Sequence, residues 1–240
     1  MGIGRLIHTL CWITVFGIAV GFMESAVVVY LRELYYPQGF AFPLQTMQGR
    51  VGLTELLREL STLVILASIA FLAGTNSRQR FAWFFYTFAI WDIFYYVFLK
   101  LLINWPGSLL TWDILFLLPT TWVGPVLAPV AVSFTMILFT AVLLLIDKRQ
   151  PSYKPGKLTL FLLTGGATVV FISFILDYSQ FMIHHCGFSA LLNEAPVNSA
   201  VQNYVPAKFD WWLFLPGMVL IYAGLGRMLF KSGIAKTKSI

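Results

Sequence analysis

The segment from Trp91 to Pro129 reads WDIFYYVFLKLLINWPGSLLTWDILFLLPTTWVGPVLAP and decides how the rest of the chain is organised. It places an acid, Asp92, inside an apolar run, followed by a short loop with three tryptophans, a second Trp-Asp pair and four prolines. Tryptophan gathers at membrane–water interfaces, and an ionisable group inside a membrane segment is rare. The segment therefore predicts a spanning helix with a buried charge, an interfacial loop and a proline-kinked returning helix.

The composition of the whole chain indicates a membrane protein. Hydrophobic residues make up 59% of the 240 residues and charged residues only 11%, whereas a soluble domain carries about 25% charged residues. A surface covered by water would need more charge than this chain has. We therefore expect an all-α fold, a polytopic bundle of transmembrane helices that forms one integral membrane domain.

Six apolar runs are long enough to cross a bilayer, which takes about 20 apolar residues per helix. The predicted spans are about 8–32, 51–74, 80–103, 120–146, 158–182 and 210–230. Two loops carry further expectations. The segment Asp113 to Leu118 could dip back into the bilayer if protein shields it, and the long polar loop from Cys186 to Lys208 could cover the outer mouth of the bundle.

The distribution of basic residues predicts the orientation. The N-terminus, the C-terminus and the segments between spans two and three and between spans four and five hold eleven of the sixteen Lys and Arg residues. By the positive-inside rule, that side faces the cytoplasm. We expect a multi-pass protein of the cell inner membrane with both termini cytoplasmic. Anionic lipid headgroups account for the basic excess, so no nucleic-acid partner is expected.

Nine of the ten acids fall at mid-membrane or toward the outside, and several lie within the predicted spans. A charge at the bilayer centre costs about 2.5–3.5 kcal/mol on insertion scales. Such residues should face the bundle interior and meet one another or a cation. The polar interior predicted in this way comprises Glu24, Glu55, Arg58, Glu59, Asp92, Tyr95, Asp177 and His184.

Span two carries the densest polar group. Glu55 and Glu59 are four residues apart and share a helix face, and Arg58 is three residues from Glu55. One interpretation is an intrahelical Glu55–Arg58 pair at the interface. The functional alternative makes Arg58 a binding group for an anionic headgroup or substrate, and makes Glu59 a proton acceptor or metal ligand.

Span three places Tyr95 and Tyr96 three and four residues after Asp92, so that a tyrosine hydroxyl could donate to the carboxylate. A hydrogen bond between helices that fixes packing is one interpretation of Asp92. The other is a proton carrier or a metal ligand.

Span five ends with the best candidate for a metal site. Asp177, His184, His185 and Cys186 follow one another toward the outer end, and imidazole and thiolate suit zinc, copper or iron. The alternative is a histidine pair that caps the helix C-terminus, where a cation is favoured. The chain contains no Walker loop, GxGxxG, HExxH or GxSxG motif.

Three functions follow from these patterns. The first is an intramembrane enzyme that uses a divalent metal or an acid–base pair on a lipid-like or small substrate. The second is a small transporter or proton conduit, and the third is an accessory subunit that docks a membrane-protein partner or a second copy. In the enzyme hypothesis the residues are assigned as follows: catalytic, Glu59, Asp92 and Glu24; substrate-binding, Arg58, Tyr95 and Tyr96; metal-binding, His184, His185, Asp177 and Glu55.

Overall fold

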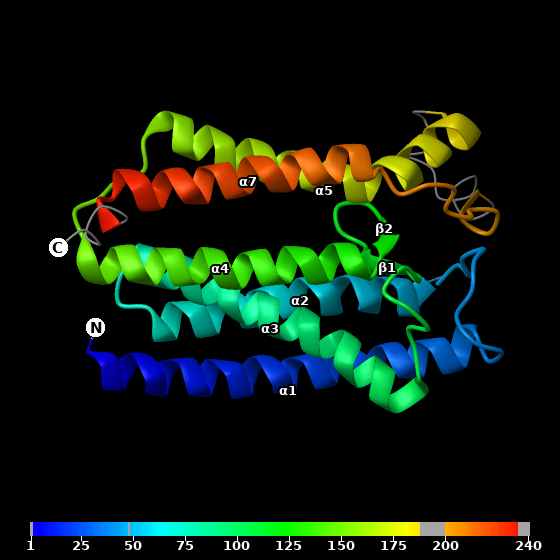
Figure 1. The fold of residues 1–240 in the computed structure, drawn as a ribbon. Coiled ribbons are helices and arrows are strands. Elements are labelled where there is room, and N and C mark those ends of the chain that lie inside the picture. Colours follow the sequence, from blue (N-terminus) through cyan, green and yellow to red (C-terminus); the bar gives the residue numbers. More distant parts are fainter. Residues whose placement is uncertain (1, 48, 188–199, 235–240) are drawn as a thin grey trace.

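A computed structural model describes residues 2–47, 49–187 and 200–234, which form six long helices and one antiparallel β-hairpin (Figure 1). In chain order the elements are α1 (Ile3–Tyr35), α2 (Gly49–Ala73), α3 (Ser77–Ile103), β1 (Trp112–Phe116), β2 (Trp122–Pro125), α4 (Leu127–Arg149), α5 (Lys157–Cys186) and α7 (Trp211–Lys231). Each of the six helices is long and apolar enough to cross a membrane. The prediction of an all-helical chain with six helices of membrane-spanning length and polarity is therefore confirmed.

The fourth predicted span begins too early. It was expected from residue 120, but residues 122–125 form strand β2, and α4 begins at Leu127. Proline explains the shift, because it lacks the N–H group that a helix interior requires. Pro125 ends the strand, and Pro129 lies in the first turn of α4, where helical N–H groups have no partner within the helix.

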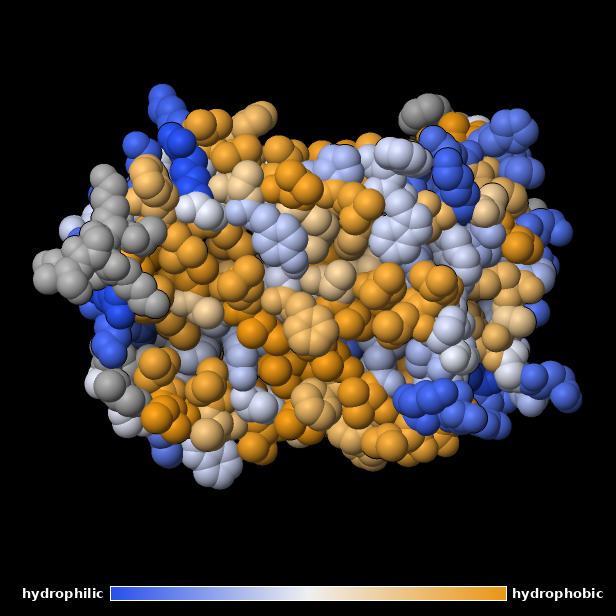
Figure 2. Space-filling view, in the orientation of Figure 1, coloured by the Kyte–Doolittle hydropathy of each residue, from blue (hydrophilic) through white to orange (hydrophobic). Residues whose placement is uncertain are grey.

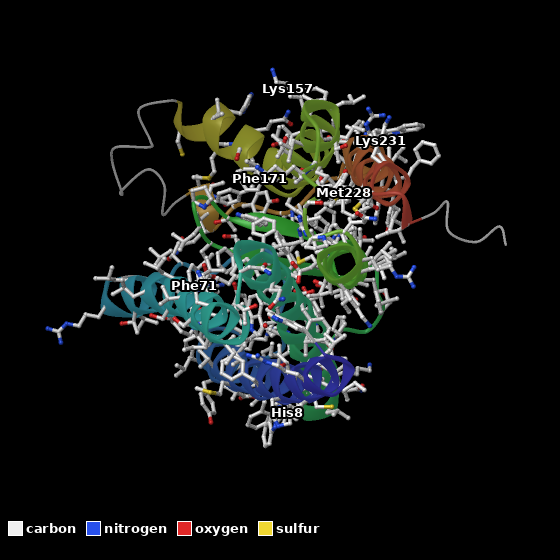
Figure 3. All side chains as sticks on the ribbon, turned by 90° about the vertical axis from the view of Figure 1, so that its left-hand side faces the viewer. His8, Phe71, Lys157, Phe171, Met228 and Lys231 are labelled. Atoms are coloured by element: carbon white, nitrogen blue, oxygen red, sulfur yellow. The ribbon has the colours of Figure 1, made fainter. Side chains whose placement is uncertain are left out.

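Helix α3 is at the centre of one group of helices, since it packs against α1, α2 and α4. Helices α5 and α7 form a second group, which joins the first where α7 meets α4 and where α5 meets β2. Figure 3 looks along the bundle and shows α1 on one side, α5 and α7 on the opposite side, and the remaining helices between them. The ribbon in Figure 1 places the N-terminus, the C-terminus and the α4–α5 connection at one end, and the hairpin at the other.

The surface has a broad apolar band with hydrophilic residues concentrated toward both ends (Figure 2). Large apolar side chains such as Leu72 and Trp212 are more than four-fifths exposed. In water, an exposed apolar surface of this extent would drive association. The band and the six apolar helices are compatible with a multi-pass membrane protein.

Small residues set how closely the helices approach. A Cβ atom at Gly166 of α5 would lie 2.7 Å from the carbonyl oxygen of Gly217 in α7, and one at Gly217 would lie 2.8 Å from Val170. These glycines let α5 and α7 approach closely, so they are used by an internal helix contact. Gly21 has the same role between α1 and α3, where an added Cβ would lie 3.0 Å from the carbonyl oxygen of Trp91.

The hairpin is the main element that the sequence did not resolve. Strand β1 pairs with β2 in antiparallel register, with Asp113 opposite Gly124 and with an irregularity between Ile114 and Phe116. Val123 is 1% exposed and Asp113 is 2% exposed, so the bundle encloses part of the hairpin. The bundle thus shields part of the segment from Asp113, and its return into the bilayer stays a prediction. Most of the loop that was expected to cover the outer mouth, residues 188–199, lies outside the described residues.

Candidate functional site

A cavity of about 110 Å³ lies between α1, α2, α3, the hairpin and the segment 36–47 that follows α1. The residues of α1 that line it belong to the second half of that helix, toward the end away from the termini (Figure 1). Five carboxyl groups and two guanidinium groups line the cavity. We call these seven residues the cavity cluster: Glu24, Arg32, Glu55, Arg58, Glu59, Asp92 and Asp113.

Arg58 joins α1 to α2. It holds Glu55 of its own helix in a two-point contact, with Nε–Oε2 and Nη2–Oε1 distances of 2.9 and 2.6 Å, and its Nη1 donates to Glu24 of α1. The intrahelical Glu55–Arg58 pair predicted from the spacing is therefore present. Because the side chains of all three residues are at most one-fifth exposed, the guanidinium balances two carboxylates that would be costly to bury alone.

Glu59 lies one helical turn beyond Glu55 and is 5% exposed. Its two carboxyl oxygens accept a hydrogen bond from the backbone N–H of Leu117, at 3.2 and 3.0 Å. Leu117 follows β1, so the contact joins the hairpin to α2. Its donor is a neutral amide, and no cation lies within salt-bridge distance of Glu59 among the described residues.

Asp92 lies in α3 and accepts a hydrogen bond from the hydroxyl of Ser133 in α4, at 2.8 Å. Asp92 thus forms a hydrogen bond between helices, as one interpretation predicted, but its partner is Ser133 and not a tyrosine. The hydroxyls of Tyr95 and Tyr96 lie 3.5 and 3.3 Å from Asp113, and they donate to that carboxylate instead. A helix places residues at i+3 and i+4 on the same face as residue i, but the hairpin brings in a second carboxylate that both tyrosines reach.

Arg32 and Asp113 are the residues of the cavity cluster that the sequence assigned to no functional role. They are 81 positions apart, and Arg32 Nη2 lies 3.1 Å from Asp113 Oδ1 in a pair that is almost fully buried. The repeated Trp-Asp dipeptide in a proline-rich apolar segment was the available signal for Asp113. For Arg32, the signal was a cation within the apolar end of span one.

The guanidinium of Arg32 is fixed by two aromatic rings as well as by its ion pair. Its Cζ lies 3.7 Å from the ring centre of Trp105 and 4.6 Å from that of Phe40, within the range of cation–π attraction. Its Nη1 is buried and has no hydrogen-bond partner among the described residues. A buried charged donor without an acceptor is rare, and it points to an absent partner at the site.

The predicted metal site does not form. No group of three or more His, Cys, Asp or Glu side chains in the described part of the chain is arranged to hold a metal ion. His184 and His185 are exposed at the end of α5, where the ring of His185 stacks on Phe181 at 4.0 Å between centroids. Glu55 is engaged by Arg58. The rings of His184 and His185 lie in edge contact, with centroids 5.2 Å apart, but the two carboxylates predicted to join them have other partners.

Asp177, the fourth residue of the predicted metal site, has a structural partner. The hydroxyl of Tyr204 donates to it at 2.6 Å, and Tyr204 itself is fully buried. Burial, followed by the hydrogen bond to Asp177, raises the pKa of the Tyr204 phenol above its ordinary value. The phenol therefore stays protonated and donates to Asp177, which ties the segment before α7 to α5.

A second polar cluster lies at the opposite end of the bundle and consists of Asn76, Arg78, Gln79 and Asp147. We call it the Asp147 cluster. Asn76 and Gln79 donate to the two oxygens of Asp147 at 3.0 and 2.7 Å, and Arg78 lies 3.7 Å away. The cavity beside it measures only about 20 Å³. These contacts fasten α3 to α4 and leave little room for a ligand.

The cavity cluster therefore contains two kinds of carboxyl group. Glu24, Glu55 and Asp113 are neutralised by arginine, whereas Glu59 and Asp92 are held by neutral donors and line open space. A carboxyl group of the second kind can take up or release a proton without losing an ion pair. No family model, curated protein or solved structure matches this chain.

Proposed function

We propose that this chain is an integral inner-membrane protein whose cavity is an acid–base site for a lipid-like or small polar substrate. The observation that carries the proposal is the pairing pattern of the five carboxyl groups around one cavity. Three are matched by Arg32 and Arg58, while Glu59 and Asp92 have only neutral partners in the described residues. Two proton-exchanging groups beside one small cavity are what general acid–base chemistry requires.

The roles within the site follow from these contacts. Glu59 and Asp92 exchange protons with the substrate, each oriented by a neutral hydrogen bond that does not fix its charge. Arg58 holds Glu24 and Glu55 and so keeps α1 and α2 at the spacing that shapes the cavity. Glu24 is then a positioning residue rather than a proton carrier, and Tyr95 and Tyr96 support Asp113.

The proposal also includes the orientation of the protein in the membrane. The end with both termini carries most of the Lys and Arg residues, so the positive-inside rule places it in the cytoplasm. The cavity then lies in the outer half of the membrane, where it is close to the lipid headgroups of the outer leaflet. A lipid-like substrate would reach it without crossing the bilayer.

The other candidate functions have less support. A metal-assisted reaction has no converging ligand set in the described residues. A proton conduit needs a polar path to the cytoplasmic end, but the polar group described there, the Asp147 cluster, closes on itself beside a cavity of about 20 Å³. An accessory subunit would dock a partner through small residues, yet Gly166 and Gly217 are covered within the chain.

Infrared difference spectroscopy during a pH titration tests the proposal. The purified protein in lipid nanodiscs should show carboxyl groups that change protonation reversibly as the pH is varied. Glu59→Gln and Asp92→Asn should each remove part of that signal, while Glu33→Gln, which changes an exposed acid at the end of α1, should leave it intact. If the signal is absent from the native protein, or persists unchanged in both variants, the acid–base proposal is wrong.

A further inference from the structure

The buried guanidinium of Arg32 is a candidate anchor for a ligand in the cavity. Arg32 lines the cavity and is 8% exposed. Its Nη2 donates to Asp113, but its Nη1 has no acceptor among the described residues. Buried N–H groups of arginine are nearly always satisfied, because desolvating a charged donor is costly. The free Nη1 therefore points to an acceptor that a ligand supplies.

The surroundings of Arg32 limit how that ligand can bind. Trp105 and Phe40 contact the guanidinium through their rings, and Asp113 takes Nη2. Further hydrogen bonds must therefore form in the plane of the guanidinium, at the edge that carries Nη1. An in-plane edge of arginine matches the oxygens of a phosphate or carboxylate group.

The carboxyl groups of the cavity, when they are ionised, disfavour a simple anion. The cavity cluster has three more carboxyl groups than guanidinium groups, and Glu59 and Asp92 have no cationic partner in the described residues. An anion at Arg32 would be repelled by them unless the same ligand brought a positive charge. A ligand with an oxyanion at one end and an ammonium group at the other satisfies both sides of the cavity.

The size of the cavity agrees with a small group of this kind. About 110 Å³ is somewhat less than the roughly 150 Å³ of a cavity that accommodates benzene. The space can hold only the polar end of a ligand, and the chains of a lipid would have to remain outside.

We infer that the cavity binds a phosphoethanolamine group, with the phosphate on Arg32 and the ammonium on Glu59 and Asp92. The inference rests on the proposed function, since it identifies the substrate class of the same site. The group is available both as the headgroup of phosphatidylethanolamine and as a free compound. Its recognition depends on the guanidinium edge and the two unmatched carboxyl groups, and requires no proton transfer.

Native mass spectrometry of delipidated protein tests the inference through the apparent Kd of the first bound lipid. The native protein should bind phosphatidylethanolamine at least tenfold more tightly than phosphatidylglycerol, which carries a phosphate but no amine. Soluble phosphoethanolamine should compete, whereas glycerol phosphate should not. A soluble compound that binds as tightly as the lipid would identify the free compound as the source, and much weaker binding would identify the lipid headgroup. Equal affinity for the two lipids would overturn the inference.

Variants of Arg32 supply the second half of the test. Arg32→Lys keeps a cation beside Asp113 but lacks the planar edge that carries Nη1, and the double change Arg32→Gln with Asp113→Asn removes both charges of the pair. Each should bind phosphatidylethanolamine at least tenfold more weakly, while Arg50→Gln, which changes an exposed arginine at the same end of the bundle, should bind like the native protein. Unchanged affinity in both Arg32 variants, with thermal unfolding showing that they fold, would overturn the inference.

The two proposals fail separately in these experiments. Lipid binding is an equilibrium measurement and does not depend on proton transfer. If the infrared titration shows no carboxyl group that changes protonation, acid–base chemistry is refuted, but the lipid preference can still be measured. Conversely, if the native protein shows the infrared signal of titrating carboxyl groups but binds both lipids with equal affinity, only the assignment of the ligand is refuted.

Discussion

The two polar clusters of this protein lie at opposite ends of the bundle and differ in how completely their groups are matched. In the Asp147 cluster, one carboxylate meets two amide donors and an arginine, and the adjacent cavity is about 20 Å³. In the cavity cluster, five carboxyl groups share two arginines around about 110 Å³. A matched cluster fastens helices together, whereas unmatched groups beside open space cost stability and are kept where function needs them.

Replacing Arg58 by methionine should have the largest effect on stability. Glu24 and Glu55 would remain buried without their cation, and losing one partner of a buried pair typically costs about 3–5 kcal/mol. The free energy of unfolding in mixed detergent micelles measures the loss. Arg50→Met is the matched control, because Arg50 is exposed. If Arg58→Met unfolds like the native protein, the interpretation of Arg58 as the link between α1 and α2 is incorrect.

The change Asp113→Asn should have the next largest effect. It leaves Arg32 without its carboxylate but keeps an oxygen acceptor, so the expected loss is about 2 kcal/mol, within the range for a hydrogen bond to a charged group. The same unfolding assay measures this loss. Asp210→Asn is the control, because Asp210 precedes α7 and its side chain makes no capping hydrogen bond to that helix. Equal stability of the two variants would mean that the hairpin is not anchored by this pair.

In the Asp147 cluster, Asp147→Asn should cost less, about 1 kcal/mol, because its donors Asn76 and Gln79 are neutral and Arg78 lies as far as 3.7 Å away. The variant should also leave the lipid preference of the cavity unchanged, as measured by native mass spectrometry. A changed preference would contradict the separation of the two clusters and would favour a path between them.

The smallest effects on stability are expected for Glu59→Gln and Asp92→Asn. Each variant keeps an oxygen that can accept the bond from Leu117 N–H or from the Ser133 hydroxyl, and neither breaks an ion pair. The change in unfolding free energy should stay within about 1 kcal/mol, the size of one neutral hydrogen bond. A loss as large as that of Arg58→Met would indicate that these carboxyl groups are structural.

Local patterns allowed part of the candidate site to be predicted. The spacing of Glu55 and Arg58 gave their pair correctly, because residues three apart always meet on a helix. Glu24, Glu59 and Asp92 were identified because charge within an apolar run has few explanations other than an interior position. The same reasoning failed for His184 and His185, which were grouped as metal ligands by type although both are exposed and no third ligand joins them among the described residues.

The sequence by itself determined six helices long and apolar enough to cross a membrane and the placement of both termini at one end, because the length and polarity of each segment are local properties. Only the tertiary structure decided which charges meet. Arg58 reaches Glu24 across 34 positions, Arg32 reaches Asp113 across 81, and Ser133 reaches Asp92 across 41. These pairs depend on how the helices rotate and approach at residues such as Gly21, and on a hairpin that folds back into the bundle. Packing among distant segments fixes the rotation of the helices and the position of the hairpin. Neither can be predicted from the hydrophobic pattern of a single segment.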